Sequence, residues 1–213
     1  MAEARRPYRS TLREEQARAT RRAIVEAGAA LFVERGFAGT TVDAIAERAG
    51  VSRKTVFTSV GGKVAVLKDA FDWALAGDDA PVPLGDRPAV RDFLTETDPA
   101  TAVEKWARVM SEIAGRLAYI HPVLVAAADV DPEAAELNET SERNRLHGAR
   151  TFVRHLREIG GLREDVSVKR GAAVAALLMD PLGYRRLVLG DGWREKEYAA
   201  WVARMAAASL LRE

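Results

Sequence analysis

Two short helical patterns joined by a tight turn occupy residues 40–63, and they constrain the fold more than any other segment. Thr40 is expected to cap the first helix by accepting a hydrogen bond from the backbone N–H of Asp43. Gly50 follows the last turn, where a left-handed backbone is common. Apolar or small residues recur at helical spacing between these ends, namely Val42, Ile45, Ala46 and Ala49.

The second pattern begins after the glycine turn, with Ser52 as the expected cap of a helix that starts at Arg53. Val56 and Val60 lie four residues apart, so both are predicted to face inward. The remaining residues would line the outer surface: Arg53, Lys54, Thr55, Phe57, Thr58 and Ser59. A helix-turn-helix of this kind places its second helix in the major groove of DNA. The alternative is an ordinary helical hairpin with a solvated charged face, and the agreement of caps, glycine turn and cations favours DNA binding.

The stretch from Arg22 to Lys63 resembles the DNA-binding domain of the tetracycline-repressor (TetR) family. The matching motifs are Leu31 to Phe37 with its Gly-Phe end, Thr40-Thr41-Val42, Ile45-Ala46, Ala49 to Ser52, Phe57 and Lys63. The sequence departs from the family pattern at Phe57, where Tyr is common, and at residues 58–60, where an aromatic-His-Phe run is common. Phe57 lacks the hydroxyl that would be carried over as a phosphate contact, and Val60 is a smaller core residue than Phe.

The candidate DNA contacts divide by chemistry. We predict that Arg53, Lys54 and Thr55 read bases or phosphates, because cations neutralise phosphates and hydroxyls bond phosphates or base edges. Phe57 is expected to pack on a thymine methyl group or on the sugar backbone. The predicted phosphate-positioning residues are Thr41, Ser52, Thr58 and Lys63.

Charge is unevenly distributed along the 213 residues, although the net charge is only +1. Residues 1–70 hold 13 Lys and Arg against 8 Asp and Glu, whereas the remainder holds 19 against 23. A basic N-terminal module joined to a mildly acidic body fits a DNA-binding domain followed by a domain of another kind, although an asymmetry this small also arises by chance.

The composition excludes several classes of protein. The absence of cysteine excludes disulfides and thiolate metal sites. No apolar run approaches the roughly 18 residues of a membrane span, and the N-terminal arginines precede no apolar signal segment. We therefore expect a cytoplasmic protein that does not enter a membrane.

Helical patterns continue along the rest of the chain. Residues 1–10 are predicted to form a mobile basic arm that contains Arg5, Arg6 and Arg9, and Thr11 with Glu14 suggests a capping box for a helix that ends near Arg35. Phe37 should fold back onto Leu31 or Phe32. A fourth helix is expected from Lys63, followed by a Pro- and Gly-rich loop over 77–90. Helices are expected to resume near Val90 and again after Pro99, where residues 102–119 carry an apolar face, and a short helix is expected from Pro122. The remaining helices are expected over 132–159, 166–179, 181–189 and 193–211.

We therefore predict an all-α protein of nine to ten helices. Residues 1–62 would form an N-terminal arm and a three-helix DNA-binding domain of the helix-turn-helix type. Residues 63–213 would form a helical effector-binding and dimerisation domain.

The TetR resemblance implies a homodimer, and two copies of a reading helix on a two-fold axis match half-sites about 34 Å apart. The candidate dimer helices are 166–179 and 193–211. The second carries an aromatic stripe that fits an interface or an intrachain core equally well, made of Trp193, Tyr198, Trp201 and Met205.

The resemblance also implies a small-molecule pocket between helices of the second domain. Five bulky apolar residues from different helices are candidates to line it: Trp73, Trp106, Met110, Tyr119 and Phe152. Their chemistry favours a small hydrophobic or aromatic effector, and ordinary core packing is the alternative for each of them.

Catalytic interpretations find little support. His147 and His155 are eight residues apart on one helix, whereas helical metal ligands usually lie three or four apart. His121 with Asp129 and Asp131 is a conceivable metal site, but a turn and a helix cap explain the aspartates better. No phosphate loop, dinucleotide fingerprint or Gly-x-Ser-x-Gly motif occurs. We therefore expect no catalytic residue, no cofactor and no metal.

We predict a sequence-specific transcriptional regulator that binds double-stranded operator DNA. Repression is the expected outcome of that binding, and activation is the alternative. A nonspecific architectural DNA binder and an enzyme on a helical scaffold are the alternatives.

Overall fold

The chain folds into helices joined by short turns. The structure is a computed structural model that describes residues 6–212, with side chains described from Arg13 onward. Its α-helices are α1 Arg6–Arg35, α2 Val42–Ala49, α3 Arg53–Ser59, α4 Lys63–Ala76, α5 Pro88–Leu94, α6 Pro99–Leu117, α7 His121–Ala128, α8 Pro132–Glu158, α9 Val168–Leu178, α10 Pro181–Tyr184 and α11 Glu195–Leu210. A 3-10 turn, η1, spans Leu84–Asp86, and a π-helical turn, η2, spans Arg185–Gly190. The predicted all-α fold is confirmed.

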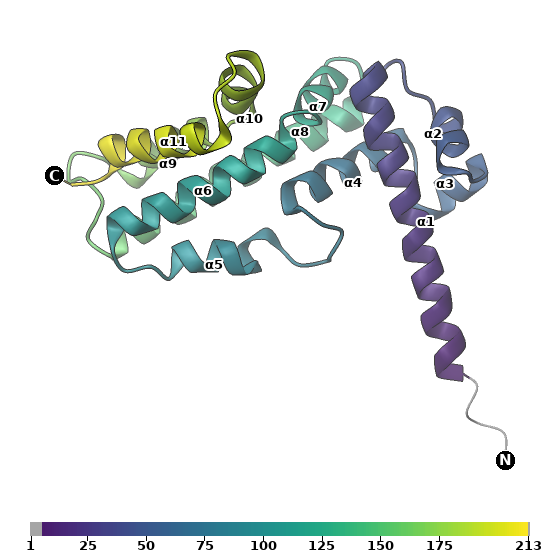
Figure 1. Cartoon of the computed structure of the whole chain (residues 1–213), viewed down its shortest axis with the longest axis horizontal. Coiled ribbons are helices and arrows are strands. Elements are labelled where there is room, and N and C mark those ends of the chain that lie inside the picture. Colours follow the sequence, from purple (N-terminus) through teal and green to yellow (C-terminus); the bar gives the residue numbers. More distant parts are fainter. Residues whose placement is uncertain (1–5, 213) are drawn as a thin grey trace.

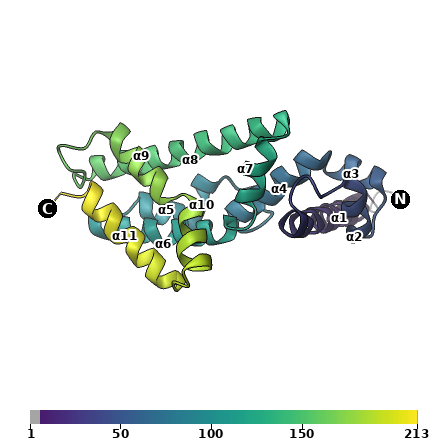
Figure 2. The same cartoon turned by 90° about the horizontal axis from the view of Figure 1, so that it is seen from above.

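The helices form an elongated molecule with two unlike ends. The N-terminal bundle, α1–α3, lies at one end of the long axis, and α9 and α11 lie at the other (Figures 1 and 2). α6 and α8 run along the body, α5–α11, and α4 connects the bundle to the body. No helix within residues 6–212 has the length and apolar character needed to cross a bilayer.

The N-terminal bundle is built around a small apolar core. Ile24, Leu31 and Phe32 of α1 are at most 2% exposed, and Ile45 and Val56 from α2 and α3 are fully buried against them. Because apolar surface leaves water at this junction, the three helices hold one another in fixed orientation. The predicted return of the chain after α1 is confirmed, since the rings of Phe37 and Phe32 stack with centroids 6.0 Å apart.

Stacked aromatic rings fill the centre of the body. Trp106 of α6 lies parallel to Phe152 of α8, with ring centroids 4.6 Å apart, and Phe93 of α5 packs edge-on against Phe152 at 5.6 Å. At the far end, α11 packs on α6, and its Tyr198 is 1% exposed with its ring 5.2 Å from that of Tyr184. The first group of rings joins α5, α6 and α8, the second joins α10 and α11, and both groups belong to one apolar core.

The start of α1 differs from the prediction. The helix begins at Arg6, five residues before the expected cap at Thr11. Pro7 explains the difference, because its fixed backbone angle suits the first turn of a helix and nothing between it and Thr11 breaks the pattern. Of the predicted basic arm, residues 1–5, including Arg5, lie outside the described residues.

The capping threonine of α2 also differs from the prediction by one residue. Thr41, not Thr40, is the cap, and its hydroxyl accepts from the backbone N–H of Ala44 at 3.1 Å. Thr40 is 1% exposed and its hydroxyl donates to the carbonyl of Gly36 at 2.8 Å. Two adjacent threonines can both cap on sequence grounds, and the carbonyl of Gly36, just after α1, accepts from the first of them.

Later boundaries agree with the expected pattern to within a few residues. The loop after α4 contains η1 and ends earlier than expected, at Pro88, which occupies the first turn of α5. The short helix at Pro181 continues into η2 up to Gly190, and α11 begins at Glu195 rather than at Trp193.

The bundle joins the body where α1 crosses α4. A Cβ atom added at Gly28 of α1 would lie 2.3 Å from Cγ1 of Val66 on α4, and Val66 is fully buried. Only glycine at this position lets the two helices approach so closely. Two ion pairs support the crossing: Arg21 with Asp69 at 2.7 Å and Arg22 with Asp79 at 2.6 Å.

We predict that Gly28→Ala destabilises the protein by about 1–3 kcal/mol, because the added methyl group overpacks the crossing. The combination of Gly28→Ala with Val66→Ala should cost less than the sum of the two single changes, since the truncated valine leaves room for the methyl group. Gly148→Ala is the matched control. It lies inside α8, and a Cβ atom there meets nothing within 4 Å, so the change should stabilise by up to about 1 kcal/mol. Urea unfolding of the four variants measures all three effects, and additive losses would contradict the proposed contact.

Candidate nucleic-acid interface

The turn between α2 and α3 has the geometry expected from its sequence. Gly50 has φ 67°, in the left-handed region, and the N–H groups of Gly50 and Val51 donate to the carbonyls of Glu47 and Ala46 at 3.1 and 3.0 Å. A residue with a side chain would be strained at this backbone angle. The glycine therefore ends α2 and redirects the chain within two residues.

Ser52 then starts α3, as predicted. Its hydroxyl accepts from the backbone N–H of Thr55 at 3.0 Å, which satisfies one of the free donors of the first turn. Val56 is fully buried, and Val60 is half-buried against the same core. Because these two valines fix the inner face of α3, its opposite face points into solvent.

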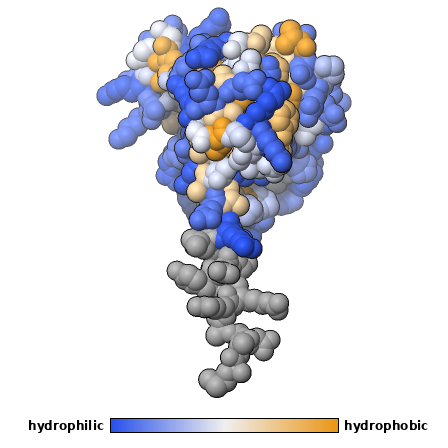
Figure 3. Space-filling model, turned by 90° about the vertical axis from the view of Figure 1, so that its right-hand side faces the viewer, coloured by the Kyte–Doolittle hydropathy of each residue, from blue (hydrophilic) through white to orange (hydrophobic). Residues whose placement is uncertain are grey.

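The predicted DNA contacts lie on or beside that outer face. Thr41, Ser52, Arg53, Lys54, Phe57 and Thr58 are exposed, and Thr55 and Lys63 are half-buried. Phe57 is 47% exposed, so its ring lies on the surface beside the cations of α3. The end of the molecule that carries the bundle is mainly hydrophilic, with a few hydrophobic patches (Figure 3).

The two cations at the start of α3 differ in their partners. Arg53 donates to the carboxylate of Asp43 on α2 at 2.5 Å, and its guanidinium lies 5.5 Å from the ring centroid of Phe57. The Lys54 ammonium has no hydrogen-bond or ion-pair partner among the described residues. The Lys54 ammonium can therefore bind a phosphate without breaking another contact. The Arg53 guanidinium must either bind a phosphate alongside the Asp43 carboxylate or release that carboxylate first.

Lys63 has a structural role that the sequence did not indicate. Its Nζ donates to the carbonyl of Phe37 at 3.0 Å and lies 3.9 Å from the centroid of the Phe37 ring. The first residue of α4 is thus tied to the chain between α1 and α2, and any phosphate contact must use the remaining N–H groups.

The four hydroxyl residues all bond the backbone or one another. Thr41 and Ser52 cap helices, the Thr55 hydroxyl lies 2.8 Å from that of Ser52, and the Thr58 hydroxyl donates to the carbonyls of Lys54 and Thr55 at 3.1 and 3.2 Å. Each oxygen is exposed or near the surface and retains capacity for a further hydrogen bond.

Two ion pairs of the bundle were missed by sequence reasoning. Arg48 of α2 donates two hydrogen bonds to Glu34 of α1, at 2.9 and 2.8 Å, and these bonds lower the pKa of Glu34 below its usual value. The Arg53–Asp43 pair links α3 to α2. The two residues of each pair lie on different helices, fourteen and ten residues apart in the sequence. Pairs within one helix are predicted from a spacing of three or four residues, and that rule does not predict these two.

The sequence of this chain matches those of bacterial transcriptional regulators. Residues 24–70 match the family described as bacterial regulatory proteins, tetR family. The chain is 31% identical over 174 residues to YdeS of Bacillus subtilis strain 168, described as an uncharacterized HTH-type transcriptional regulator, with 81% of this chain and 80% of the relative covered. The chain belongs to the TetR family. It is therefore a DNA-binding transcriptional regulator, and the resemblance noted in the sequence is confirmed.

Solved structures of TetR-type regulators share the whole fold. NalD, the secondary repressor of the MexAB-OprM multidrug efflux pump in Pseudomonas aeruginosa, superimposes with a TM-score of 0.69 at 19% identity, covering 92% of this chain and 99% of that one. SmeT, the repressor of a multidrug efflux pump of Stenotrophomonas maltophilia, solved with triclosan, gives a TM-score of 0.65 at 23% identity, covering 92% and 93%. Identities this low show likeness of fold alone.

The five predicted effector residues of this TetR-family chain differ in their surroundings. Trp106, Met110 and Phe152 are at most 6% exposed, and the Trp106 and Phe152 rings are in direct contact. Trp73 of α4 is half-buried against the core, and Tyr119, between α6 and α7, is 52% exposed. Three of the five come together in the core, and their role in effector binding stays a prediction.

The three residues of the conceivable metal site have different structural surroundings. Asp131 caps α8 by accepting from the N–H groups of Glu133 and Ala134 at 3.0 and 3.1 Å, as a helix cap should. His121 is buried at the start of α7 with its Nε2 3.9 Å from Glu142, and burial lowers its pKa. Asp129 is exposed.

We predict that Lys54→Gln and Lys63→Gln separate DNA contact from folding. Lys54→Gln should change stability by less than about 0.5 kcal/mol, because the ammonium has no partner. It should lower the slope of log affinity against log salt by about one unit if Lys54 contacts a phosphate. Lys63→Gln should lower the slope similarly and also cost about 1–3 kcal/mol of stability, because a charged hydrogen bond and a cation–π contact are lost. Urea unfolding and salt titrations of DNA binding test both, and an unchanged salt slope in either variant would remove that lysine from the interface.

Proposed function

We propose that the protein is a homodimeric repressor that binds a two-fold operator through α3 and is released by a small hydrophobic or aromatic effector. Residues 1–62 would bind DNA, and residues 63–213 would hold the effector and the partner subunit. A regulator of this kind acts on DNA in the cytoplasm. The observation that carries the proposal is the solvent-facing side of α3, where Arg53 and Lys54 are exposed beside Phe57.

The chemistry of that face supports reading of a duplex. Arg53 and Lys54 supply the cations, and Thr55 supplies a hydroxyl near the leading edge of the helix. Thr41, Ser52, Thr58 and Lys63 surround them as the proposed phosphate contacts. The Asp43 carboxylate holds Arg53 in place when DNA is absent, and a phosphate or a guanine edge would take over that hydrogen bonding.

The last helices of the body support a dimer. Large apolar side chains are exposed on its last helices and turns: Leu177 is 73% exposed, Leu182 61%, Leu189 42% and Met205 37%. Exposed apolar side chains on consecutive elements favour contact with a partner. The residues of the aromatic stripe have two kinds of surroundings. Tyr198 belongs to the core, whereas Trp193 and Trp201 are half-buried and pack edge-on against each other, with ring centroids 6.2 Å apart.

We predict that Leu177→Lys converts the dimer to a monomer, since a charge would be buried at the centre of the proposed interface. Operator affinity should fall at least tenfold because two half-sites are no longer bound together. Val130→Lys is the matched control: Val130 is 69% exposed in the turn between α7 and α8, and its variant should stay dimeric. Sedimentation equilibrium measures the state of both variants, and a dimeric Leu177→Lys protein would exclude this surface.

The effector part of the proposal rests on the relatives and on chemistry. SmeT has been solved with triclosan, an aromatic molecule. Trp73, Trp106, Met110, Tyr119 and Phe152 supply apolar surface in the corresponding domain of this chain. Because Trp106 and Phe152 already stack on each other, an effector among them must displace side chains, which is a route to a second conformation with poorer DNA binding.

A gel-shift assay with DNA from upstream of the gene tests the regulator function. Selective retention of one fragment over scrambled DNA of equal length is expected, and Arg53→Ala should change the preferred sequence in a random-oligonucleotide selection. Retention without sequence preference would favour an architectural DNA binder. Failure to retain any DNA would overturn the proposal and reopen the enzyme alternative.

A further inference from the structure

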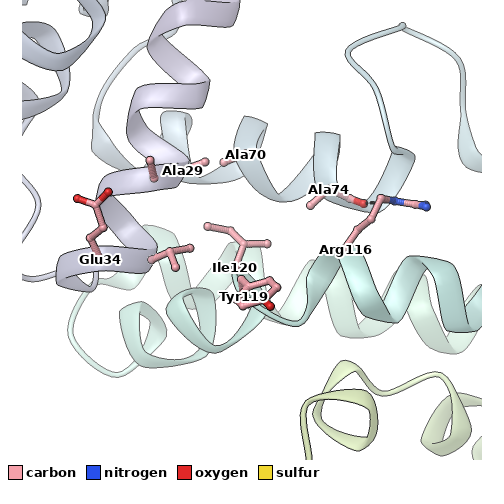
Figure 4. A pocket seen from close by; sticks show the side chains of 9 residues that line it. Ala29, Glu34, Ala70, Ala74, Arg116, Tyr119 and Ile120 are labelled. Atoms are coloured by element: carbon pink, nitrogen blue, oxygen red, sulfur yellow. Dashed lines mark hydrogen bonds between the residues drawn. The ribbon is translucent and has the colours of Figure 1, made fainter. Parts of the chain in front are cut away.

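A hollow of about 390 Å³ lies where the N-terminal bundle meets the body. It is bordered by α1, by α4 and by the turn between α6 and α7 (Figure 4). Tyr119 alone among the five predicted effector residues lines it. The remaining lining residues are Ala29, Ala30, Val33, Glu34, Ala70, Ala74, Arg116 and Ile120.

The hollow follows from the way α1 and α4 cross. Gly28 brings the two helices into close contact at Val66, and the next residues toward the hollow are small on both helices. Alanines at 29 and 30 face alanines at 70 and 74, so short side chains leave open the space beyond the crossing. Two large apolar side chains stand at its edge, where Val33 is 48% and Tyr119 52% exposed.

The charged residues on the rim are already engaged. Glu34 accepts two hydrogen bonds from Arg48. Arg116 donates to the carbonyls of Ala74 and Leu75 at 2.8 and 3.1 Å, so its guanidinium turns to the end of α4 and its stem lines the hollow (Figure 4). A charged ligand would lose hydration here without gaining an unpaired charged partner. A neutral apolar ligand has no charge to desolvate, so it avoids this cost.

We propose that this hollow binds a small neutral apolar molecule, aromatic by preference because the Tyr119 ring forms one wall, and that this ligand sets the placement of the bundle on the body. At about 390 Å³ the hollow has room for a small molecule, and because it is an open depression, one side of the bound molecule would stay in water. The site is separate from the stacked pair Trp106 and Phe152, and it needs no rearrangement of the core.

Coupling to DNA follows from which elements form the walls. Ala29, Ala30 and Val33 move with α1 and hence with α3, whereas Tyr119 and Ile120 move with the body. A molecule that contacts both walls binds best at one angle between them. We expect that angle to differ from the one that operator DNA requires, so that the ligand and DNA favour different placements of the bundle and the ligand lowers DNA affinity. By linkage, operator DNA must lower the affinity of the ligand by the same factor. This part of the inference rests on the proposed function.

Binding is tested with N-phenyl-1-naphthylamine, a neutral aromatic probe whose fluorescence rises in apolar sites. The dimeric wild-type protein should bind it saturably. Ala74→Leu and Ala30→Leu, which fill the hollow from two different helices, should each weaken binding at least tenfold. Tyr119→Ala should weaken it severalfold without loss of folding, since that side chain is half exposed. Ala126→Leu is the matched control on the exposed side of α7 and should bind as the wild type does.

The outcomes separate this inference from the proposed function. Saturable binding that both filling variants leave unchanged, while their thermal unfolding shows them folded, would place the probe elsewhere and overturn the inference, as would absence of saturable binding. Neither result affects selective operator retention, which is measured without the probe. With the site occupied, operator affinity should fall in the wild type and in Ala126→Leu but not in Ala74→Leu. An equal fall in all three would overturn the coupling.

Discussion

The close crossing of α1 and α4 at Gly28 and Val66 fixes how the rest of the molecule is arranged. α1 carries the apolar face on which α2 and α3 are built, and α4 is the helix that the body holds through α6. A larger residue at position 28 would separate these two helices and with them the two functional parts of the chain. The orientation of α3 relative to the body is therefore set by a contact that lies outside the proposed DNA-binding and dimer surfaces.

The crossing is reinforced by polar contacts at both ends of α4. Lys63 ties its first residue to the carbonyl of Phe37, and Arg116 holds its last carbonyls from the body. Burial of the Asp69 carboxylate raises its pKa even though Arg21 pairs with it, so desolvation outweighs attraction at this point. A helix tied at each end and packed in the middle moves as a unit, which suits it to pass a change in the body on to the bundle.

The sequence predicts local features well because their causes are local. Gly50 and Ser52 could be assigned to the turn because left-handed backbone and capping oxygens each select few residue types. Thr40 was misassigned because Thr41 offers the same chemistry, and only the tertiary position of the Gly36 carbonyl distinguishes them. The ion pair between Arg53 and Asp43 joins two different helices, so the spacing of charged residues within one helix does not predict it.

The hollow beside Tyr119 shows why sites between helices are hardest to predict. Trp106 and Phe152 are predicted pocket residues because bulky apolar side chains line pockets, and in this structure the same bulk lets their rings stack on each other. Their role in effector binding stays a prediction. Space is left instead where side chains are small, at alanines that carry no chemical signal in the sequence. A pocket is a property of the gap between helices, and the size of a gap depends on the crossing that brings them together. In this chain the same crossing at Gly28 that orients α3 also creates an opening between the bundle and the body from which that orientation could be changed.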